Sequence, residues 1–302
     1  MLFLEFVIMA LVSGNNLSVC SGTIIGSRIS SRKVGVVVAI LGYAAGFLLE
    51  GKLLRRGVTA ILPVRSEGLL VLALTIAIVI FIIAHRKRVP QSLSVNFTSI
   101  LLGISVALGF HIDWLFAILI LAFWVLAPLL SMLLMIPAMR GASSMARGWH
   151  IWKATRLMRP VLFAIAFFAA FTLGANTLGF LYSALPDSAS AAALFVALAA
   201  IVFGSTFLSS GELNRIGNEI IPMRYLNSVI SQTLSVFFVE LATIVGVPLS
   251  NTQTLTANIY GAGLSYKGRF MNKSPAVSIA LTWLLGALLS FGLAFGLSVL
   301  LF

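Results

Sequence analysis

The chain has 302 residues, of which 60% are hydrophobic and only 9% are charged, and its mean hydropathy is +1.09. This composition excludes an ordinary soluble domain and is typical of a protein embedded in a lipid bilayer. The net charge of +12 lies in short basic clusters between apolar runs, which favours cytoplasmic loops over a nucleic-acid-binding surface. The single cysteine, Cys20, forms neither an intrachain disulfide nor a thiolate metal site by itself.

The first residues lack a basic region and run directly into polar residues, so we expect the N-terminal segment to be retained rather than cleaved as a signal peptide. A spanning helix needs about 20 mostly apolar residues. By this measure we predict spanning helices near 34–54, 68–85, 114–137, 188–208, 226–247 and 275–302. Four other apolar segments are too short or too polar to cross simply: 1–13, 92–110, 161–175 and 250–266.

The same order of segments occurs twice. Each half has a short segment, a polar break, two long helices, a Pro-x-Ser turn, a second short segment and another long helix. We therefore predict an all-α polytopic membrane protein of two inverted-topology repeats, with broken or re-entrant half-helices that meet at the midplane. The predicted repeats are residues 1–137 and 161–302, joined by a basic cytoplasmic linker, 138–160, that lies against anionic lipid.

The Pro-x-Ser turns at 90–92 and 248–250 are the clearest matched pair, and aligning them also matches Ser94 with Thr252. Proline cannot continue a preceding helix, and the serine after it can cap the next one. Each turn thus opens a half-helix whose N–H groups and hydroxyls are free to hold an oxyanion. Polar breaks of this kind, one in each half of an apolar chain, are typical of carriers.

A second matched pair is rich in amides, hydroxyls and glycines, at 13–27 and at 174–177. Glycines allow a broken helix, and the free N–H groups at its end attract an anion. The alternative is that these small residues only let helices approach one another closely.

Glu240 lies inside a long apolar run, 235–247, and we interpret it as the only acidic residue so placed. A carboxylate inside a membrane binds a cation or proton, or pairs with a polar group. The alternative is that Glu240 only hydrogen-bonds a broken helix and holds the turn at Pro248. We find no motif for nucleotide hydrolysis, nucleophilic catalysis or a metal site, so we predict neither an enzyme nor a bound cofactor.

These residues resemble a known family. Residues 174–177 and 13–16, the latter followed by Gly22-Thr23, resemble the duplicated Gly-Ala-Asn-Asp…Gly-Thr signature of the inorganic phosphate transporter family, the phosphate permeases. Residues 248–253 are similar to that family's Pro-Val-Ser-Thr-Thr segment, and Glu240 stands where the family has a glutamate before it.

The resemblance implies a secondary transporter that moves phosphate, or in some members sulfate, by alternating access coupled to H⁺ or Na⁺. The oxyanion contacts that it implies are Asn15, Thr23, Ser92, Ser94, Asn176, Ser250, Asn251 and Thr252. The family's aspartates are Asn16 and Thr177 here, so Glu240 is the main candidate for the coupling ion, with these two positions beside it. The resemblance implies a multi-pass protein of the plasma membrane and leaves monomer and homodimer both open.

Two other interpretations remain from the sequence. One is a sulfate permease of the same family. The other is a non-transporting sensor or scaffold derived from that family. A membrane-embedded enzyme that acts on lipid is disfavoured, because the sequence offers no nucleophile with its base and no metal ligand set.

Overall fold

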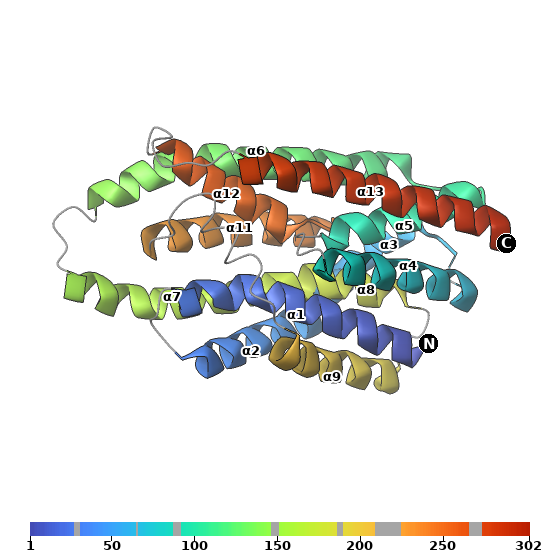
Figure 1. Cartoon of the computed structure of the whole chain (residues 1–302), viewed down its shortest axis with the longest axis horizontal. Coiled ribbons are helices and arrows are strands. Elements are labelled where there is room, and N and C mark those ends of the chain that lie inside the picture. Colours follow the sequence, from blue (N-terminus) through green and yellow to red (C-terminus); the bar gives the residue numbers. More distant parts are fainter. Residues whose placement is uncertain are drawn as a thin grey trace.

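The computed structural model describes residues 1–26, 31–64, 66–86, 92–145, 151–185, 190–208, 225–265 and 274–302. Its elements are α1 (Leu2–Gly26), α2 (Arg32–Glu50), η1 (Gly51–Leu54), α3 (Arg55–Ile61), α4 (Glu67–Arg86), α5 (Leu93–Ala107), α6 (Trp114–Met145), α7 (Ile151–Leu173), η2 (Gly174–Leu178), α8 (Gly179–Ala184), α9 (Ala191–Phe207), α11 (Tyr225–Val245), α12 (Asn251–Ser265) and α13 (Ser274–Leu301). These helices lie side by side along the long axis, with both chain termini at one end (Figure 1).

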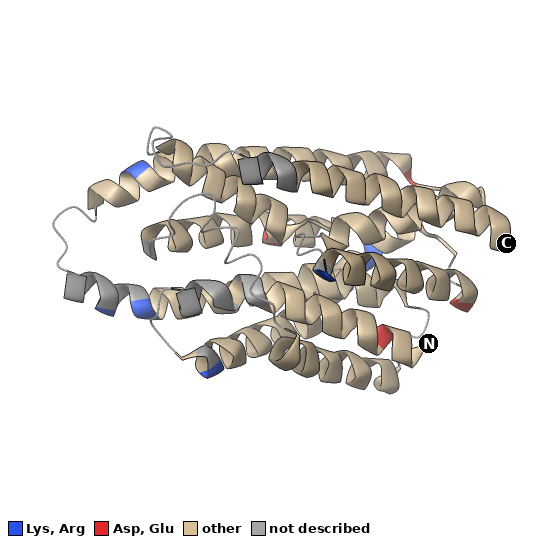
Figure 2. Ribbon diagram, in the orientation of Figure 1, with Lys and Arg blue, Asp and Glu red and all other residues tan. Residues whose placement is uncertain are grey.

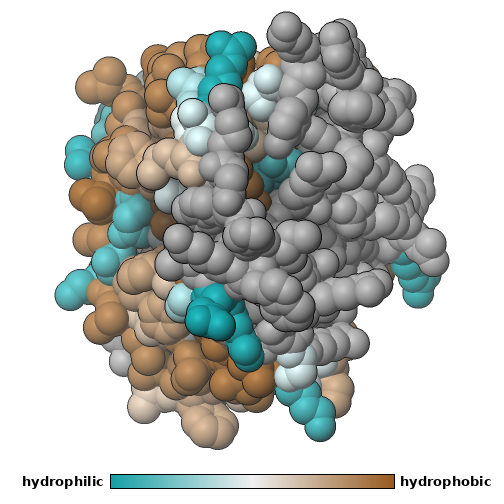
Figure 3. Space-filling view, turned by 90° about the vertical axis from the view of Figure 1, so that its left-hand side faces the viewer, coloured by the Kyte–Doolittle hydropathy of each residue, from teal (hydrophilic) through white to brown (hydrophobic). Residues whose placement is uncertain are grey.

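Much of the helical length carries no charged residue (Figure 2). Six segments of the described chain are long and apolar enough to cross a membrane: Lys33–Ile61, Glu67–Ala84, Trp114–Met145, Arg159–Ala184, Leu226–Val245 and Ala280–Leu301. Many of their leucine, valine and phenylalanine side chains are exposed, and hydrophobic residues cover much of the coloured surface in the end-on view of Figure 3. The chain is therefore a multi-pass membrane protein.

Two helical hairpins bring distant parts of the sequence together. In α11–α12, Ser235 lies against Asn251 and the amide of Asn258 reaches back to the Ser231 carbonyl, so the two helices run antiparallel. In α4–α5, the start of α4 and the later part of α5 both pack along α13. From their turns, α5 runs toward the end that holds the termini and α12 runs away from it (Figure 1).

Local chemistry explains where these hairpins turn. Helix α11 ends at Gly246, whose φ of +84° is in the left-handed region that glycine adopts without strain. Ser250 then caps α12 by accepting from the Gln253 N–H at 3.4 Å, as Ser92 caps α5 by accepting from the Val95 N–H at 3.3 Å. The predicted half-helix starts are therefore confirmed. Pro90 and Gln91 of the first turn lie outside the described residues.

The polar stretch 13–16 does not break a helix, contrary to the sequence prediction, because α1 continues from Leu2 to Gly26. Ser13 and Asn16 are buried against neighbouring helices, and Asn16 donates to the Tyr43 hydroxyl at 3.1 Å. A side-chain contact of this kind satisfies a polar group inside the bundle without interrupting the helical backbone.

Two further predictions about segment length are wrong. Segment 161–175, expected to be a short element, belongs to the candidate span Arg159–Ala184, interrupted only by the π-helical turn η2. Segment 188–208, expected to span, contains the 17-residue helix α9, which is in the shorter class. Hydropathy alone misjudged the first because it does not show whether the turn at Gly174 stays helical, and the second because it does not show that Ser190 begins the helix.

Close backbone contact fixes α2 against α7 and η2. A Cβ at Gly46 would lie 1.9 Å from the Phe171 carbonyl oxygen, and a Cβ at Gly174 would lie 1.9 Å from that of Tyr43. Only glycine fits at such contacts, which are a usual means of packing helices in membranes. They place the π-turn that carries Asn176 and Thr177 directly beside the hairpin turn of α11–α12.

Candidate oxyanion site

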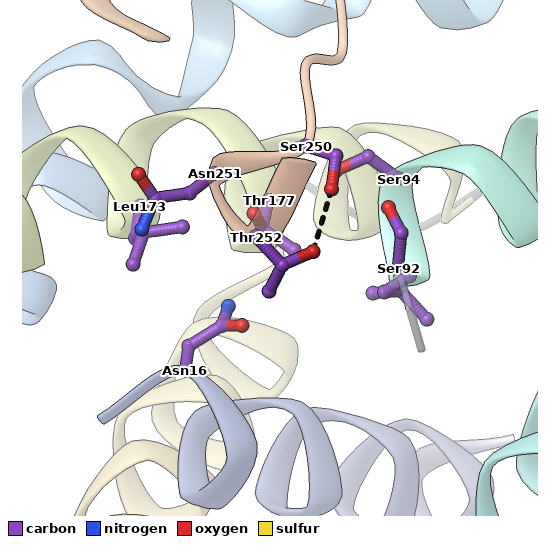
Figure 4. A pocket seen from close by; sticks show the side chains of 9 residues that line it. Asn16, Ser92, Ser94, Leu173, Thr177, Ser250, Asn251 and Thr252 are labelled. Atoms are coloured by element: carbon purple, nitrogen blue, oxygen red, sulfur yellow. Dashed lines mark hydrogen bonds between the residues drawn. The ribbon is translucent and has the colours of Figure 1, made fainter. Parts of the chain in front are cut away.

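A small polar cavity lies where the two hairpins begin their second helices. Four elements supply its lining: α1, the α7–η2 junction, the start of α5 and the start of α12 (Figure 4). The lining residues are Asn16, Ser92, Leu93, Ser94, Leu173, Thr177, Ser250, Asn251 and Thr252. Seven of these are predicted site residues, so the structure brings together groups that lie up to 236 positions apart, Asn16 to Thr252.

None of the lining side chains carries a formal charge. Positive potential comes instead from the N-termini of α5 and α12, each equivalent to roughly half an elementary charge. The side-chain amide nitrogen of Asn251 is buried and has no hydrogen-bond partner among the described residues. A buried donor without a partner costs about 1–3 kcal/mol, and an anion in the cavity would remove that cost.

The hydroxyl groups are arranged to face one another. Ser250 Oγ and Thr252 Oγ1 lie 2.8 Å apart, and Ser94 and Ser92 approach from the other hairpin (Figure 4). Since Ser92 uses only an oxygen lone pair to cap its helix, its hydroxyl proton can be donated elsewhere, and the bond between Ser250 and Thr252 uses the proton of only one of these two hydroxyls. The cavity is thus lined mainly by neutral donors, with space for about one water molecule.

Asn16 and Thr177, predicted as coupling-ion positions, lie in this cavity rather than at a separate place. Asn16 donates one amide hydrogen to Tyr43, which fixes its orientation. Thr177 projects from the π-helical turn, an irregularity that often occurs at functional sites. Their side chains offer amide and hydroxyl groups where a carboxylate would repel an anion.

Asn176, predicted to contact the oxyanion, does not line the cavity. Its amide donates to Thr243 Oγ1 at 2.9 Å and to the Val247 carbonyl at 3.0 Å, and its oxygen accepts from the Leu249 N–H at 2.9 Å. Two of these bonds go to the turn before Ser250, and the third goes to the last part of α11. Asn176 therefore positions that turn, and its amide has little capacity left for a ligand.

Two more predicted contacts are not placed in the cavity. Asn15 is half-buried, does not line the cavity and has an interaction of its own. The side chain of Thr23 lies outside the described part of the structure, although its backbone belongs to α1.

Glu240 lies on α11 outside the cavity, with the carboxyl group of Glu50 beside it. Each of these two side chains has one buried carboxyl oxygen without a hydrogen-bond partner in the described chain. Two carboxylates this close repel one another unless a proton or a cation lies between them. The pair can therefore take up one positive charge.

The sequence prediction missed Glu50, and the statement that only Glu240 lies in an apolar run is wrong. Glu50 belongs to the candidate span Lys33–Ile61 and to the span predicted near 34–54, but the sequence analysis gave it no role. The available signal was the leucine-rich run immediately before it. Among the described residues, no three histidine, cysteine, aspartate or glutamate side chains gather to hold a metal ion.

Comparison with known proteins agrees with the geometry. A family model described as "Phosphate transporter family" matches residues 142–294, about half of the chain. A search of curated proteins finds no match. Among solved structures, the fold is similar to one titled "The sodium-dependent phosphate transporter", with a TM-score of 0.78 and 15% sequence identity, over 99% of this chain and 97% of that one. At this identity the similarity is one of fold.

Proposed function

Because this chain belongs to the phosphate transporter family, we propose that it is a secondary transporter of the plasma membrane that carries inorganic phosphate through the cavity between its two hairpins. The observation that carries this proposal is the cavity itself. Two capped helix N-termini and a set of hydroxyls line it, together with Asn251, whose amide nitrogen has no hydrogen-bond partner among the described residues. Such a set of fixed dipoles replaces the hydration of a tetrahedral anion without a formal positive charge.

We further propose that the chain is two inverted repeats, residues 1–137 and 161–302, joined by the basic segment 138–160. The opposite directions of α5 and α12 support this. The order of the helices before and after the hairpin is also similar in the two halves. Inverted repeats of this kind give a carrier two related states, one open to each side. Since the cavity has space for about one water molecule, phosphate entry requires the hairpin tips to separate.

We assign coupling to the carboxyl pair of Glu240 and Glu50. A group that binds a proton or Na⁺ on one side and releases it on the other couples the gradient to transport. The solved transporter of similar fold is titled sodium-dependent, so Na⁺ stands beside H⁺ as a candidate ion. Because Asn16 and Thr177 at the cavity are neutral, a cation needs a carboxylate elsewhere, and Glu50 and Glu240 supply two side by side.

The test is uptake of radiolabelled phosphate into proteoliposomes with Na⁺ and H⁺ gradients imposed separately. We expect saturable uptake that Asn251→Ala and Thr252→Ala weaken in apparent affinity by about ten- to hundred-fold, the value of a lost hydrogen bond to a charged group. Leu173→Met, a change of lining residue that keeps every polar group, is the matched control. No uptake under any gradient would favour a sensor or scaffold instead.

Sulfate is the second candidate, and the neutral lining favours it. A hydrogen phosphate ion carries a P–OH group that needs an acceptor, whereas sulfate needs only donors. The lining has no carboxylate for that role, although its hydroxyl oxygens can accept. Competition by sulfate at concentrations similar to phosphate would identify a site that binds both anions, and saturable sulfate uptake without phosphate uptake would replace the substrate.

A further inference from the structure

A second cavity lies away from the hairpins, between the end of α2 and the start of α9. Its volume is about 510 Å³, within the range of small-molecule sites, and it shares no lining residue with the oxyanion cavity. The lining residues are Phe47, Leu48, Gly51, Lys52, Arg55, Tyr182, Ser183, Ser190, Ala191 and Leu194. From this composition we infer that the cavity binds the phosphate headgroup of an anionic phospholipid.

The charged side chains that line the cavity are positive. Lys52 and Arg55 lie one helical turn apart, and none of the described lining residues is acidic. Glu50, close by along the chain, lies against Glu240 instead, and Glu5 lies near the phenol of Tyr182 without lining the cavity. Two cations just after the end of α2 attract the phosphate of a lipid.

Neutral donors complete the polar side. Ser190 caps α9 by accepting from the Ala193 N–H at 3.1 Å, so its hydroxyl proton remains free to donate. The 17-residue helix α9 begins here, which adds the positive end of its dipole to the two cations. Tyr182 is held in place by edge-on contact with Phe47, with ring centroids 5.0 Å apart.

The lining also has an apolar wall, and this separates a lipid from free phosphate. Phe47, Leu48 and Leu194 form that wall, and Leu48 is 51% exposed within a candidate membrane span. Free phosphate gains nothing from such a wall, whereas the glycerol and upper acyl chains of a phospholipid bury against it. The shared chemistry is a phosphate group, and the wall favours the lipid as its source.

The chain offers a matched pair of arginines for the test. Arg55 lines the cavity, whereas its neighbour Arg56 stacks over the Phe116 ring, with Cζ 5.1 Å from the ring centroid, and does not line it. Arg55→Gln and Arg56→Gln remove the same charge from the same helix. Lys52→Gln is a second, independent change in the cavity.

The full chain in neutral detergent is titrated with phosphatidylglycerol, with phosphatidylcholine and with inorganic phosphate, and thermal stability and lipid retention by native mass spectrometry are measured. We expect Arg55→Gln and Lys52→Gln each to weaken phosphatidylglycerol binding by about ten-fold or more, Arg56→Gln to leave it unchanged, and phosphatidylcholine to bind weakly throughout. Inorganic phosphate should affect all variants as it affects the wild type.

Equal retention of phosphatidylglycerol by Arg55→Gln and Arg56→Gln would overturn the assignment, whether both keep the lipid or both lose it. Weakened binding of inorganic phosphate in Arg55→Gln and Lys52→Gln, with lipid binding intact, would also overturn it and make the cavity a site for the free anion. Because these changes lie outside the oxyanion cavity, a failure here leaves the proposed transport function untouched.

Discussion

The hairpin α11–α12 is joined by side-chain hydrogen bonds, whereas the corresponding hairpin α4–α5 is packed mainly through apolar groups, although both begin a helix at the same cavity. Ser235 bonds to both Asn251 and Thr254, Asn258 donates to the Ser231 carbonyl, and Ser131 on α6 donates to Asn258. These bonds connect α6, α11 and α12 into one unit.

Around α5 the polar groups are present but not joined in this way. Helix α4 contributes buried leucines and alanines, and Asn96 on α5 has an interaction of its own. Four buried hydroxyls on α5 and α13 have no hydrogen-bond partner among the described residues: Thr98, Ser105, Ser290 and Ser298. Because these four hydroxyls form no directional bond among the described residues, a shift of α5 breaks few bonds, so we expect α5 to move against α13 while α12 stays with α6.

The largest effect should come from the residue that fixes the second hairpin turn. Asn176→Ala removes three hydrogen bonds and leaves the buried Leu249 N–H without its acceptor, which should cost about 3 kcal/mol of stability and abolish uptake. Thermal unfolding in detergent measures the loss. Thr243→Val removes only one of the three bonds and should cost about 1 kcal/mol. Equal effects of the two variants would contradict a role for Asn176 as the fixing residue.

Next in size is the loss of coupling at the carboxyl pair. Glu240→Gln removes one of the two charges that need a proton or cation between them, so uptake should still equilibrate but no longer concentrate phosphate. Glu50→Gln should have the same effect, because the charge is held by the pair. Uptake across a pH series, with and without Na⁺, checks this. A Glu240→Gln variant with wild-type dependence on both gradients would show that coupling lies elsewhere.

Sequence analysis identified the parts of the cavity that follow from local helix-capping chemistry. It missed the interactions between residues that are far apart in the sequence. The starts of α5 and α12 follow from proline and serine chemistry, and Ser92 and Ser250 cap them as predicted. The interaction of Asn176 with the turn, in contrast, joins residues 67 to 73 positions apart. The periodicity of hydrophobic residues in the sequence does not indicate a hydrogen bond over this separation. Glu50 was missed for the same reason, because only the folded chain brings it to Glu240.

The two caps give a direct comparison of the hairpins at the cavity. Ser92→Ala and Ser250→Ala each remove one cap, which should cost about 1 kcal/mol of stability, and each removes a donor for the anion. If phosphate lies between the two helix N-termini, both variants should weaken its apparent affinity by a similar factor of about ten. Competition uptake measures that factor. A loss confined to Ser250→Ala would place the anion on the second hairpin alone.

The smallest expected effect is the difference in hydrogen bonding between the two hairpins and the helices that they pack against. Ser131→Ala on α6 removes the donor to Asn258, so it should destabilise the protein by about 0.6–1 kcal/mol, the usual size of a hydrogen bond between membrane helices. Ser105→Ala on α5 removes a buried hydroxyl that has no partner in the described chain, so it should be neutral or slightly stabilising. Thermal unfolding of the two single variants and of the double variant gives the comparison. Because the two residues are on different helices, their changes in the free energy of unfolding should add.

If Ser105→Ala instead slows uptake while leaving stability unchanged, the hydroxyl finds its partner in the other transport state, which is the expected behaviour of an α5 that slides along α13. If Ser105→Ala is as destabilising as Ser131→Ala, the first hairpin is bonded like the second and the predicted difference in mobility is wrong.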